Sequence, residues 1–397
     1  RQWSAALRAF AAMRAAGLRP NEMCYGVVIA ACEWQDSLQL LLEMRGSGLA
    51  PTPVCHNPAI SACERAHRPA AALRLFADMR RRGPEPDAFA LTAALAALAR
   101  AERWEEAEGL LGEMRQGDLR PNVFANNAVI SAFEKAASWR RALLLASQPG
   151  IDTVGLNAAV SACEKAVEWT KAVLLLAIAR SGKGPAANVV THNAAISACE
   201  KGRQSRLAWR LLRELSASSL QPSLITYNSV ISAYEKCREW ELAALVLERL
   251  QSEGLDADAI VTLNAAVSAC EKGSQWAQAL QLLNSGQRRG PPPDVITCNG
   301  AISACERSQQ FGRALELFSA MRRGGPEPDA VSYNAAMAAC EAGLAWARAL
   351  QLMEELGGSR LAASATTYNA ALGACAAAGA WQPALRLFAE MRQARLG

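Results

Sequence analysis

A box of eight residues returns along the whole chain at a nearly constant interval. It reads Asn-Ala-Ala-Ile-Ser-Ala-Cys-Glu at 193–200, and most copies follow the previous one by 35 or 36 residues. A period of this length is typical of stacked supersecondary units that share one continuous core. The first residue of each copy, the leading residue, is Gly26, Asn57, Thr92, Asn127, Asn157, Asn193, Asn228, Asn264, Asn299, Asn334 or Asn369. We therefore predict one elongated array rather than two or three globular domains.

Apolar spacing within one unit predicts two helices. In the unit that begins at Val295, apolar residues from Cys298 to Cys305 recur at offsets of three, four and seven, which marks one face of a helix. A second segment, 313–322, has similar spacing and is ended by glycines and prolines. No strand pattern is present, so the expected fold is an all-α solenoid.

The repeat boundaries follow from this register. A partial repeat at 1–21 precedes the repeats 22–52, 53–87, 88–122, 123–152, 153–188, 189–223, 224–259, 260–294, 295–329 and 330–364, and a truncated repeat occupies 365–397. The chain begins and ends inside a repeat, so we expect it to be a fragment, with any targeting segment or catalytic domain lying outside it.

Cysteine and tryptophan recur in fixed slots, which favours packing roles. Eight of the twelve cysteines share one slot and no Cys-x-x-Cys pair occurs, so we interpret them as small buried residues in a reducing compartment. A tryptophan stands twelve residues after most leading residues: Trp104, Trp139, Trp169, Trp240, Trp276, Trp346 and Trp381. Such a stripe could stack bases, but its place at the start of the second helix favours packing between repeats.

A positive charge follows the box in eight consecutive units. Each cation lies eight residues after the leading residue, with a serine usually four residues before it, so that all three share one helix face. The cations are Arg65, Arg100, Lys135, Lys165, Lys201, Lys236, Lys272 and Arg307. We predict that they meet phosphates; the alternative is that they form solubilising pairs with the preceding glutamates.

Three residues before the leading residue the chain is apolar in almost every unit. From the second unit onward these residues are Val54, Phe89, Phe124, Val154, Val190, Ile225, Val261, Ile296 and Val331, while Thr366 departs from the pattern. An apolar side chain beside an amide suits a flat heteroaromatic ring, because the apolar group covers the face of the ring and the amide meets the edge of the ring. Ordinary packing at the start of the helix is the alternative.

Catalytic and metal chemistry find no support in the sequence. The three histidines form no His-x-Glu motif with paired cysteines, and we interpret His56 and His192 as core residues. Phosphate-binding glycine loops, nucleophile motifs and acidic metal clusters are absent, so we expect no enzyme activity, metal or cofactor. The net charge is only +5, and no apolar run is long enough to span a bilayer.

Together these features resemble the pentatricopeptide repeat family over essentially the whole chain. The motifs are the 35-residue period, Thr-Tyr-Asn at 226–228, Ser-Tyr-Asn at 332–334 and the Pro-Asp closers at 293–294 and 328–329. The resemblance implies a P-type array that forms a right-handed α-solenoid superhelix of about ten to eleven helix-turn-helix repeats. The Ser-Ala-Cys-Glu-Lys variant is similar to organellar members from dinoflagellate algae.

The resemblance also implies that the leading residue and the residue closing the repeat together read one RNA base. The apolar residues named above would then sandwich neighbouring bases. The pairs are Asn57 with Asp87 (U), Thr92 with Asn122 (A), Asn127 with Asp152 (U), Asn157 with Asn188 (a pyrimidine), Asn193 with Ser223 (C), Asn264 with Asp294 (U), Asn299 with Asp329 (U) and Asn334 with Ser364 (C). Asn228 has either Asp258 or Ala259 as its closer, so its base is unassigned. The implied target is 5′-U-A-U-Y-C-N-U-U-C.

The implied function is sequence-specific binding of single-stranded RNA, one base per repeat. The resemblance places it in organellar RNA processing, stability, editing or translation, in the chloroplast or alternatively the mitochondrion. We expect a monomer that contacts the transcript, with RNA-processing proteins as further partners. Two alternatives stay open: a scaffold for protein–protein interaction, and the targeting arm of a larger RNA-processing enzyme.

Overall fold

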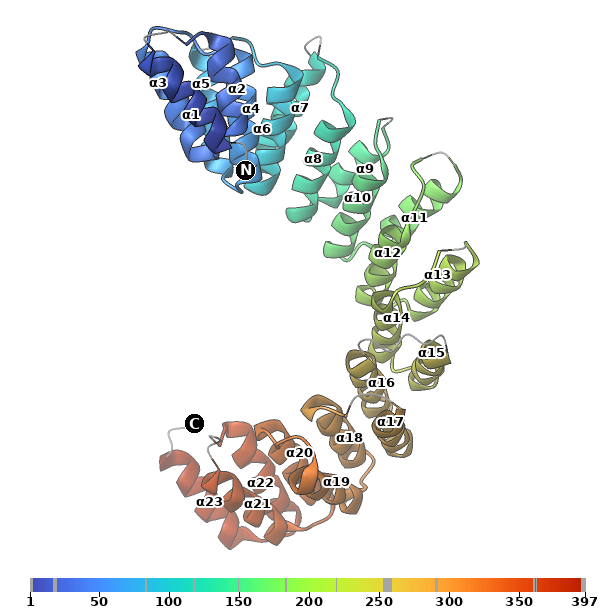
Figure 1. Ribbon diagram of the computed structural model, residues 1–397. Coiled ribbons are helices and arrows are strands. Elements are labelled where there is room, and N and C mark those ends of the chain that lie inside the picture. The colour runs from blue at the N-terminus through green and yellow to red at the C-terminus, as the bar shows by residue number, and fades with distance from the viewer. Residues whose placement is uncertain are drawn as a thin grey trace. The chain divides into compact units, whose positions relative to one another are not determined.

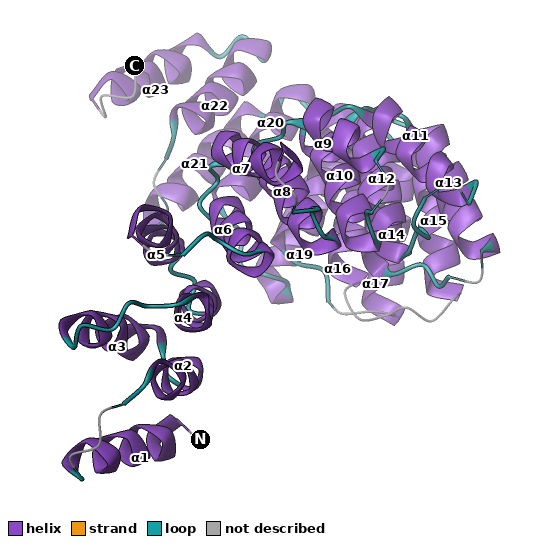
Figure 2. Ribbon diagram, turned by 90° about the horizontal axis from the view of Figure 1, so that it is seen from above, coloured by secondary structure: helices purple, strands orange, loops and turns teal. Residues whose placement is uncertain are grey.

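The chain is helical throughout its described part. The computed structural model describes residues 3–16, 20–82, 84–116, 119–148, 150–182, 184–218, 220–252, 259–289, 292–359, 361 and 363–393. These residues form 23 α-helices and no strand (Figure 2). The prediction of an all-α array of helical hairpins is confirmed.

Alternate helices are the first helices of the repeats. They are α2 (Glu22–Ala31), α4 (Pro53–Arg65), α6 (Ala88–Arg100), α8 (Val123–Lys135), α10 (Thr153–Lys165), α12 (Val189–Lys201), α14 (Leu224–Cys237), α16 (Ala259–Lys272), α18 (Val295–Arg307), α20 (Ala330–Ala342) and α22 (Ala365–Ala377). Each carries the box that recurs in the sequence.

The remaining helices are the second helices, and most of them begin at a tryptophan. They are α1 (Trp3–Ala15), α3 (Trp34–Gly46), α5 (Pro69–Arg82), α7 (Trp104–Gln116), α9 (Trp139–Ala146), α11 (Trp169–Arg180), α13 (Ser205–Ala217), α15 (Trp240–Ser252), α17 (Trp276–Arg289), α19 (Phe311–Gly324), α21 (Trp346–Gly358) and α23 (Trp381–Gln393). Helix α9 has 8 residues where α7 has 13, because the unit led by Asn127 is short.

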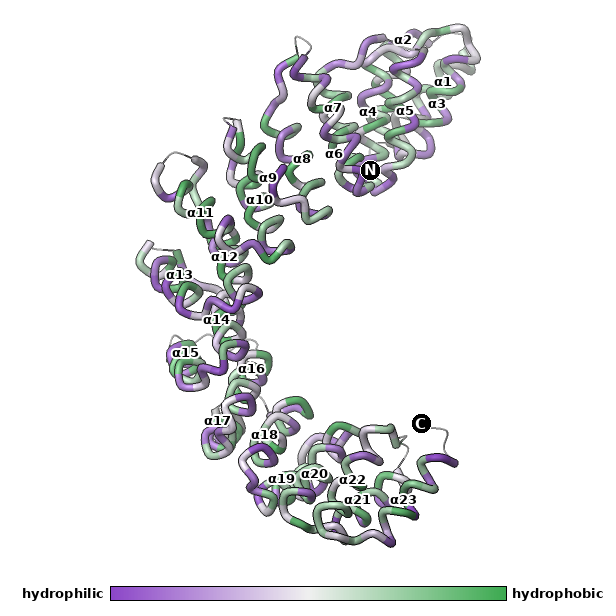
Figure 3. The backbone as a smooth tube through the Cα atoms, turned by 180° about the vertical axis from the view of Figure 1, so that it is seen from behind, coloured by the Kyte–Doolittle hydropathy of each residue, from purple (hydrophilic) through white to green (hydrophobic). Residues whose placement is uncertain are grey.

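The helices form two compact units, Arg1–Ala198 and Cys199–Gly397. Within the first unit the first helices α4, α6, α8 and α10 pack side by side in chain order, and within the second α14, α16, α18, α20 and α22 do the same (Figure 1). A second helix such as α7 or α15 contacts the first helix of its own repeat and that of the next. Figure 3 shows hydrophobic and hydrophilic stretches alternating along the helices of both units.

Closing residues explain where the first helices begin. An oxygen of Asp87, Asn122 or Asp294 accepts a hydrogen bond of 2.8 Å from the backbone N–H three residues later. A side-chain acceptor at this N-cap position satisfies a backbone donor that the helix leaves free, and a carboxylate also suits the positive end of the helix dipole. The residue that ends one repeat therefore starts the helix of the next.

The core consists of apolar residues from both helices of each repeat, such as Ile130 of α8 and Leu212 of α13, both fully buried. The eight cysteines of the shared slot are buried free thiols, which confirms their interpretation as core residues: Cys32, Cys63, Cys163, Cys199, Cys270, Cys305, Cys340 and Cys375. Burial raises the pKa of Cys163 to about 11 and that of Cys199 to about 12, so both thiols are protonated near neutral pH. Within the described part of the chain, every helix is too short or too polar to cross a bilayer.

The aromatic residue that begins a second helix packs against the next repeat. The ring centroids of Trp104 and Phe133 lie 6.3 Å apart. A Cβ added at Gly273 would lie 2.6 Å from Cδ1 of Trp240, so the absence of a side chain there makes room for the indole. These contacts confirm the packing interpretation for Trp104 and Trp240, whereas Trp381 in the last helix is 66% exposed.

A left-handed residue turns the chain between the two helices of most repeats. Nine of these residues are not glycine and have φ between 50° and 61°: His67, Glu102, Ala137, Val167, Arg203, Arg238, Ser274, Gln309 and Leu344. The Val167 N–H donates to Glu164 O at 3.1 Å, and the Glu168 N–H donates to Cys163 O at 2.9 Å, which closes the C-terminus of α10. A β-branched residue is strained in this region.

Replacing Val167 by glycine relieves that strain. We expect Val167→Gly to raise the free energy of unfolding by about 1 kcal/mol, because the lost strain of roughly 1–2 kcal/mol exceeds the added entropy of the unfolded chain. Thermal and urea unfolding of the purified protein measure the change. Gly379→Val, at the equivalent turn with φ 70°, should have the opposite sign. Unchanged or reduced stability in Val167→Gly would contradict the assignment of strain.

Acid should weaken the second unit through its capping aspartates. Burial acts to raise the pKa of Asp294, but hydrogen bonds from Thr297 and from the Asn264 amide outweigh it, so the pKa lies below its ordinary value. The pKa of Asp329 is lowered in the same way. A lowered folded-state pKa stabilises the fold above the unfolded-state pKa of about 3.9, and this contribution is lost as pH falls through the folded-state pKa.

The Asp294→Asn/Asp329→Asn double variant keeps a capping oxygen but removes the titrating group. Its thermal midpoint should fall less steeply than that of the parent between pH 5 and pH 3, measured by circular dichroism. An equally steep fall in both proteins would show that the caps do not contribute to the acid sensitivity.

Candidate nucleic-acid interface

A row of large apolar side chains lies exposed in the first turn of the first helices. Met23 and the nine residues predicted to sandwich bases are each 56–74% exposed. Such residues are usually scattered when they have no role, whereas these recur at one position in ten successive repeats. Their exposure is inconsistent with ordinary core packing, the alternative considered from the sequence.

Beside this row, four leading asparagines donate a side-chain hydrogen bond to the aspartate that closes their repeat. The Nδ2-to-carboxylate distances are 2.7 Å for Asn57 and Asp87, 2.8 Å for Asn127 and Asp152, 3.1 Å for Asn264 and Asp294, and 3.1 Å for Asn299 and Asp329. The two members of each pair are 25 or 30 residues apart in sequence. The structure thus brings together each predicted Asn–Asp reading pair.

The other predicted pairs are arranged differently. Thr92 donates to Ala88 O at 2.7 Å, with no bond to Asn122 in the described structure. Asn157 and Asn188 are bridged, because both of their Oδ1 atoms lie within 3.0 Å of Thr191 Oγ1.

Toward the C-terminus, Asn334 donates to Thr366 at 3.3 Å, and Ser364 lies 2.6 Å from the same Thr366 hydroxyl. In the repeat led by the half-buried Asn193, Ser223 caps α14 and receives the Thr226 N–H at 3.4 Å. Asp258, one of the two closers considered for Asn228, lies outside the described residues.

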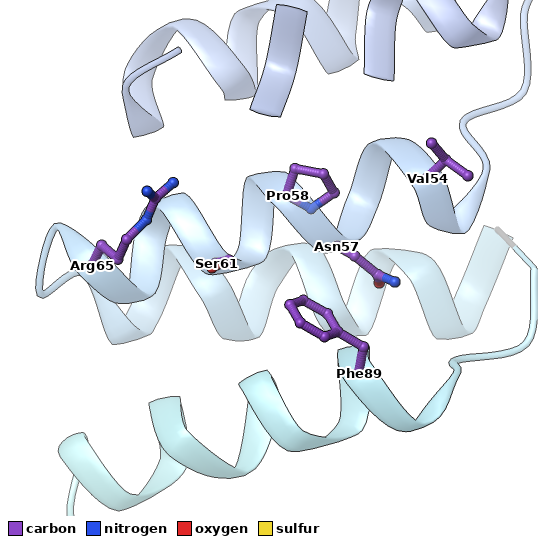
Figure 4. Close-up of a pocket in the computed structure, with 6 residues that line it drawn as sticks. All are labelled: Val54, Asn57, Pro58, Ser61, Arg65 and Phe89. Carbon is purple, nitrogen blue, oxygen red and sulfur yellow. The ribbon is translucent and has the colours of Figure 1, made fainter. Parts of the chain in front are cut away.

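The first complete repeat shows how the parts combine. A pocket of about 540 Å³ lies between α4 and α6 and is lined by Val54, Asn57, Pro58, Ser61, Arg65 and Phe89. In Figure 4 the Asn57 amide lies between Val54 of its own helix and Phe89 of the next first helix. The pocket therefore offers two apolar walls, a hydrogen-bonding amide and, further along α4, a guanidinium group.

Most of the predicted phosphate-binding cations pair with a glutamate of the preceding repeat. Lys236 Nζ lies 2.9 Å from Glu200 Oε1, which also accepts from Ser232 at 2.8 Å. The equivalent pairs are Lys165 with Glu134, Lys272 with Glu235, Arg307 with Glu271 and Arg100 with Glu64, at 2.7–3.4 Å. Lys201 also has a partner. We call this set of contacts the carboxylate ladder.

The carboxylate ladder offsets most of the positive charge of the predicted phosphate-binding cations. It bears on both interpretations made from the sequence, which are contact with phosphates and pairing with glutamates. The cations do pair with glutamates, but with those of a neighbouring repeat rather than the residue before them. The glutamates are 17–25% exposed. Burial raises the pKa of Glu271 above its ordinary value, an effect that Arg307 opposes.

Two cations have no carboxylate partner among the described residues. Lys135 donates to the backbone oxygen of Ala99 at 3.1 Å, because alanine stands there where most repeats have glutamate. Arg65 lines the pocket beside Asn57. Uncompensated positive charge therefore lies near the N-terminal repeats of the first unit.

His56 and His192 are buried in the slot that tyrosine fills elsewhere, which confirms them as core residues. Their Nδ1 atoms lie 3.2 Å from Thr52 O and 3.0 Å from Asn188 O, and burial lowers the pKa of His56. Across the described ranges, no three His, Cys, Asp or Glu side chains cluster closely enough to hold a metal ion.

Two sets of residues at this surface were not anticipated from the sequence. One is the set of glutamates in the carboxylate ladder. The other is the hydroxyl residues in the first turn, such as Thr226 and Ser332, which complete capping boxes with Ser223 and Asp329. A capping residue followed three positions later by threonine or serine is the signal that could have identified the second set.

Comparison with known proteins gives a consistent family assignment. Models described as pentatricopeptide repeat domain match residues 74–135, 181–237 and 210–272, the PPR repeat family model matches 293–341, and the PPR repeat model matches 54–84 and 366–396. Together these matches span well over half of the chain. No curated protein sequence matches it.

Several solved structures are similar. The pentatricopeptide repeat protein PPR10 from maize is 20% identical with a TM-score of 0.46, over 100% of this chain and 67% of that one. PPR10 in complex with an 18-nt psaJ RNA element is 18% identical with the same TM-score, over 100% and 72%. The PPR domain of Arabidopsis thaliana protein-only RNase P 1 in complex with tRNA is 13% identical with a TM-score of 0.38, over 44% and 91%. On the family models and the repeated hairpins, the chain belongs to the pentatricopeptide repeat family.

Proposed function

We propose that the chain binds single-stranded RNA and reads one base per repeat. The observation that carries the proposal is the periodic surface itself, where an exposed apolar side chain stands beside a part-buried asparagine in successive repeats. Nucleobases are flat, with apolar faces and hydrogen-bonding edges, and proteins that read single-stranded RNA stack on the face and bond the edge.

The pocket between α4 and α6 supports this proposal, because its lining suits one base. Val54 and Phe89 cover its two faces, and the Asn57–Asp87 pair meets its edge. Asn57 still has an N–H beyond the one given to Asp87, and the carboxylate can accept a base N–H. Each exposed apolar side chain borders the pockets of two neighbouring repeats. Successive bases and apolar side chains therefore alternate along the row.

Family membership supports RNA as the ligand and 5′-U-A-U-Y-C-N-U-U-C as the target. The protein acts by occupancy, as a monomer, in the processing, stability, editing or translation of a transcript in the chloroplast, with the mitochondrion as the alternative. Covering about nine nucleotides blocks a nuclease, opens a hairpin or recruits a processing enzyme. A protein-binding scaffold would be expected to vary its contact residues, whereas this surface repeats the same ones.

Base preference tests the reading pairs. The protein should bind the nine-base RNA at least about tenfold more tightly than a scrambled RNA, since each mismatch costs roughly 1 kcal/mol or more. Asn122→Asp should move the preference at the second base from A towards G and leave the third base, read by Asn127 and Asp152, unchanged. Fluorescence anisotropy with RNAs that carry single-base changes measures the affinity and the base preference. Equal affinity for the target and the scrambled RNA would exclude the proposal.

Salt dependence tests which cations meet phosphate. If all eight did, log Kd would rise against log salt with a slope of about 6, at about 0.7 per phosphate; with the two uncompensated cations alone the slope is about 1.4. We expect the lower value, because the carboxylate ladder compensates most of the row.

Two substitutions change which cations of the carboxylate ladder have a glutamate partner. Ala99→Glu gives Lys135 the carboxylate that it lacks, and should lower the slope by about 0.7 and weaken binding. Glu235→Gln releases Lys272 and should do the reverse. Unchanged slopes in both variants would show that phosphates lie away from these cations.

A further inference from the structure

Among the described contacts, a hydroxyl group of the next repeat reaches the leading asparagine in four places. In each, a threonine or serine in the first turn of one first helix donates to Oδ1 of the asparagine on the preceding first helix. The four pairs are Thr191 with Asn157, Thr262 with Asn228, Thr297 with Asn264 and Ser332 with Asn299. All four hydroxyl residues are 0% exposed. The contact therefore lies beneath the proposed RNA surface and is out of reach of a bound base.

In the repeat led by Asn264 the hydroxyl completes a closed network of three side chains. Asn264 Nδ2 donates to Asp294 Oδ2 at 3.1 Å, while its Oδ1 accepts from Thr297. The Thr297 backbone N–H donates to Asp294 Oδ1 at 2.8 Å, and the Thr297 hydroxyl lies 2.8 Å from the same oxygen, so its single proton is shared between Asn264 and Asp294. Asn299, Asp329 and Ser332 form the same network.

The network holds the asparagine amide in a single orientation. If the amide of Asn264 turned over, its oxygen would face the Asp294 carboxylate, and two acceptors would meet where a donor and an acceptor now do. A buried acceptor without a donor is unfavourable, so both ends of the amide are constrained. The second N–H of Nδ2 and the remaining lone pair of Oδ1 then have defined directions.

Two of the repeats led by asparagine lack this hydroxyl, and there the amide oxygen is orphaned. Ala90 and Gly155 occupy the hydroxyl position after Asn57 and Asn127. Oδ1 of each of these asparagines is buried with no hydrogen-bond partner in the described structure. Asn334 Oδ1 is unpartnered as well, because the Thr367 hydroxyl at that position lies 3.0 Å from Ser364 Oγ instead. A Cβ at Gly155 would overlap Oδ1 of Asn127, so this amide has moved into the space that a side chain takes in other repeats.

We propose that the buried hydroxyl is a positioning residue: it fixes the base-reading amide of the preceding repeat and thereby sets how strictly that repeat discriminates between bases. The inference rests on the proposed reading of RNA by the leading asparagines. It makes each repeat's specificity depend on a residue of the next repeat. The bases read by Asn264 and Asn299 are selected more strictly than those read by Asn57 and Asn127.

A crossed pair of substitutions tests the proposal within the second unit. Thr297→Val keeps the shape of the side chain and removes the hydroxyl beneath Asn264, which reads the seventh base; Ser332→Ala does the same beneath Asn299, which reads the eighth. We expect the parent to prefer U over C by about tenfold at both bases. Thr297→Val should reduce the preference to below about threefold at the seventh base only, and Ser332→Ala at the eighth base only. Thr297→Ser restores the hydroxyl and should restore the preference.

Each outcome decides between positioning and a merely structural role. Loss of preference confined to the predicted base, with affinity for a scrambled RNA unchanged, supports the proposal. Unaltered preference, or equal loss at both bases, overturns it. A parent protein that shows no preference at any base would instead reject the proposed function.

A gain of hydroxyl provides a test that does not depend on the folding of the two loss variants. Ala90→Ser places a hydroxyl beneath Asn57 and should raise the U-over-C preference at the first base severalfold, leaving the seventh and eighth bases unchanged. Ala90→Val is the matched control, because it adds bulk without a donor. An equal change in preference in both variants would contradict the proposal.

Discussion

In four repeats the aspartate at the N-cap of a first helix joins the architecture to the candidate site. Asp294 accepts the backbone N–H that begins α18 and also the amide of Asn264 from the preceding first helix. One carboxylate therefore sets where a helix starts and where a polar group of the neighbouring helix points. In a solenoid each repeat is stabilised mainly by contacts with its neighbours, so a bond that crosses between repeats affects both.

Charged side chains on the same surface also form contacts between adjacent repeats. The carboxylate ladder places a glutamate of one repeat beneath the serine and the cation of the next, as Glu235 does for Ser268 and Lys272. Partly buried ion pairs hold adjacent first helices together while they reduce the field that a phosphate would experience. Because alanine stands at position 99, no glutamate among the described residues offsets the charge of Lys135. Positive potential is therefore concentrated there rather than spread evenly along the row of cations.

Much of the fold was predictable because it depends on spacing. The period, the two helices per repeat, the cysteine slot and the tryptophan stripe all follow from positions within 35 residues, and the spacing also identified the Asn–Asp pairs that meet in space. The partners of the cations were not predictable in this way, since Glu200 and Lys236 lie 36 residues apart and the adjacent glutamate is an equally plausible partner. The left-handed turns were hidden for another reason: glycine, the usual signal, occurs at one of them, Gly379, and the others adopt the conformation under strain.

The contact between Thr297 and Asn264 has a consequence for recombining such arrays. A repeat transplanted with boundaries at the helix start would lose the hydroxyl that orients its own asparagine and would import one suited to a different neighbour. The exchangeable segment instead runs from just after one such hydroxyl to just after the next, so that it includes the asparagine, its closing residue and the group beneath them. Chimeras joined at those points would keep each hydrogen-bonded group of side chains intact, even though the join falls inside a helix.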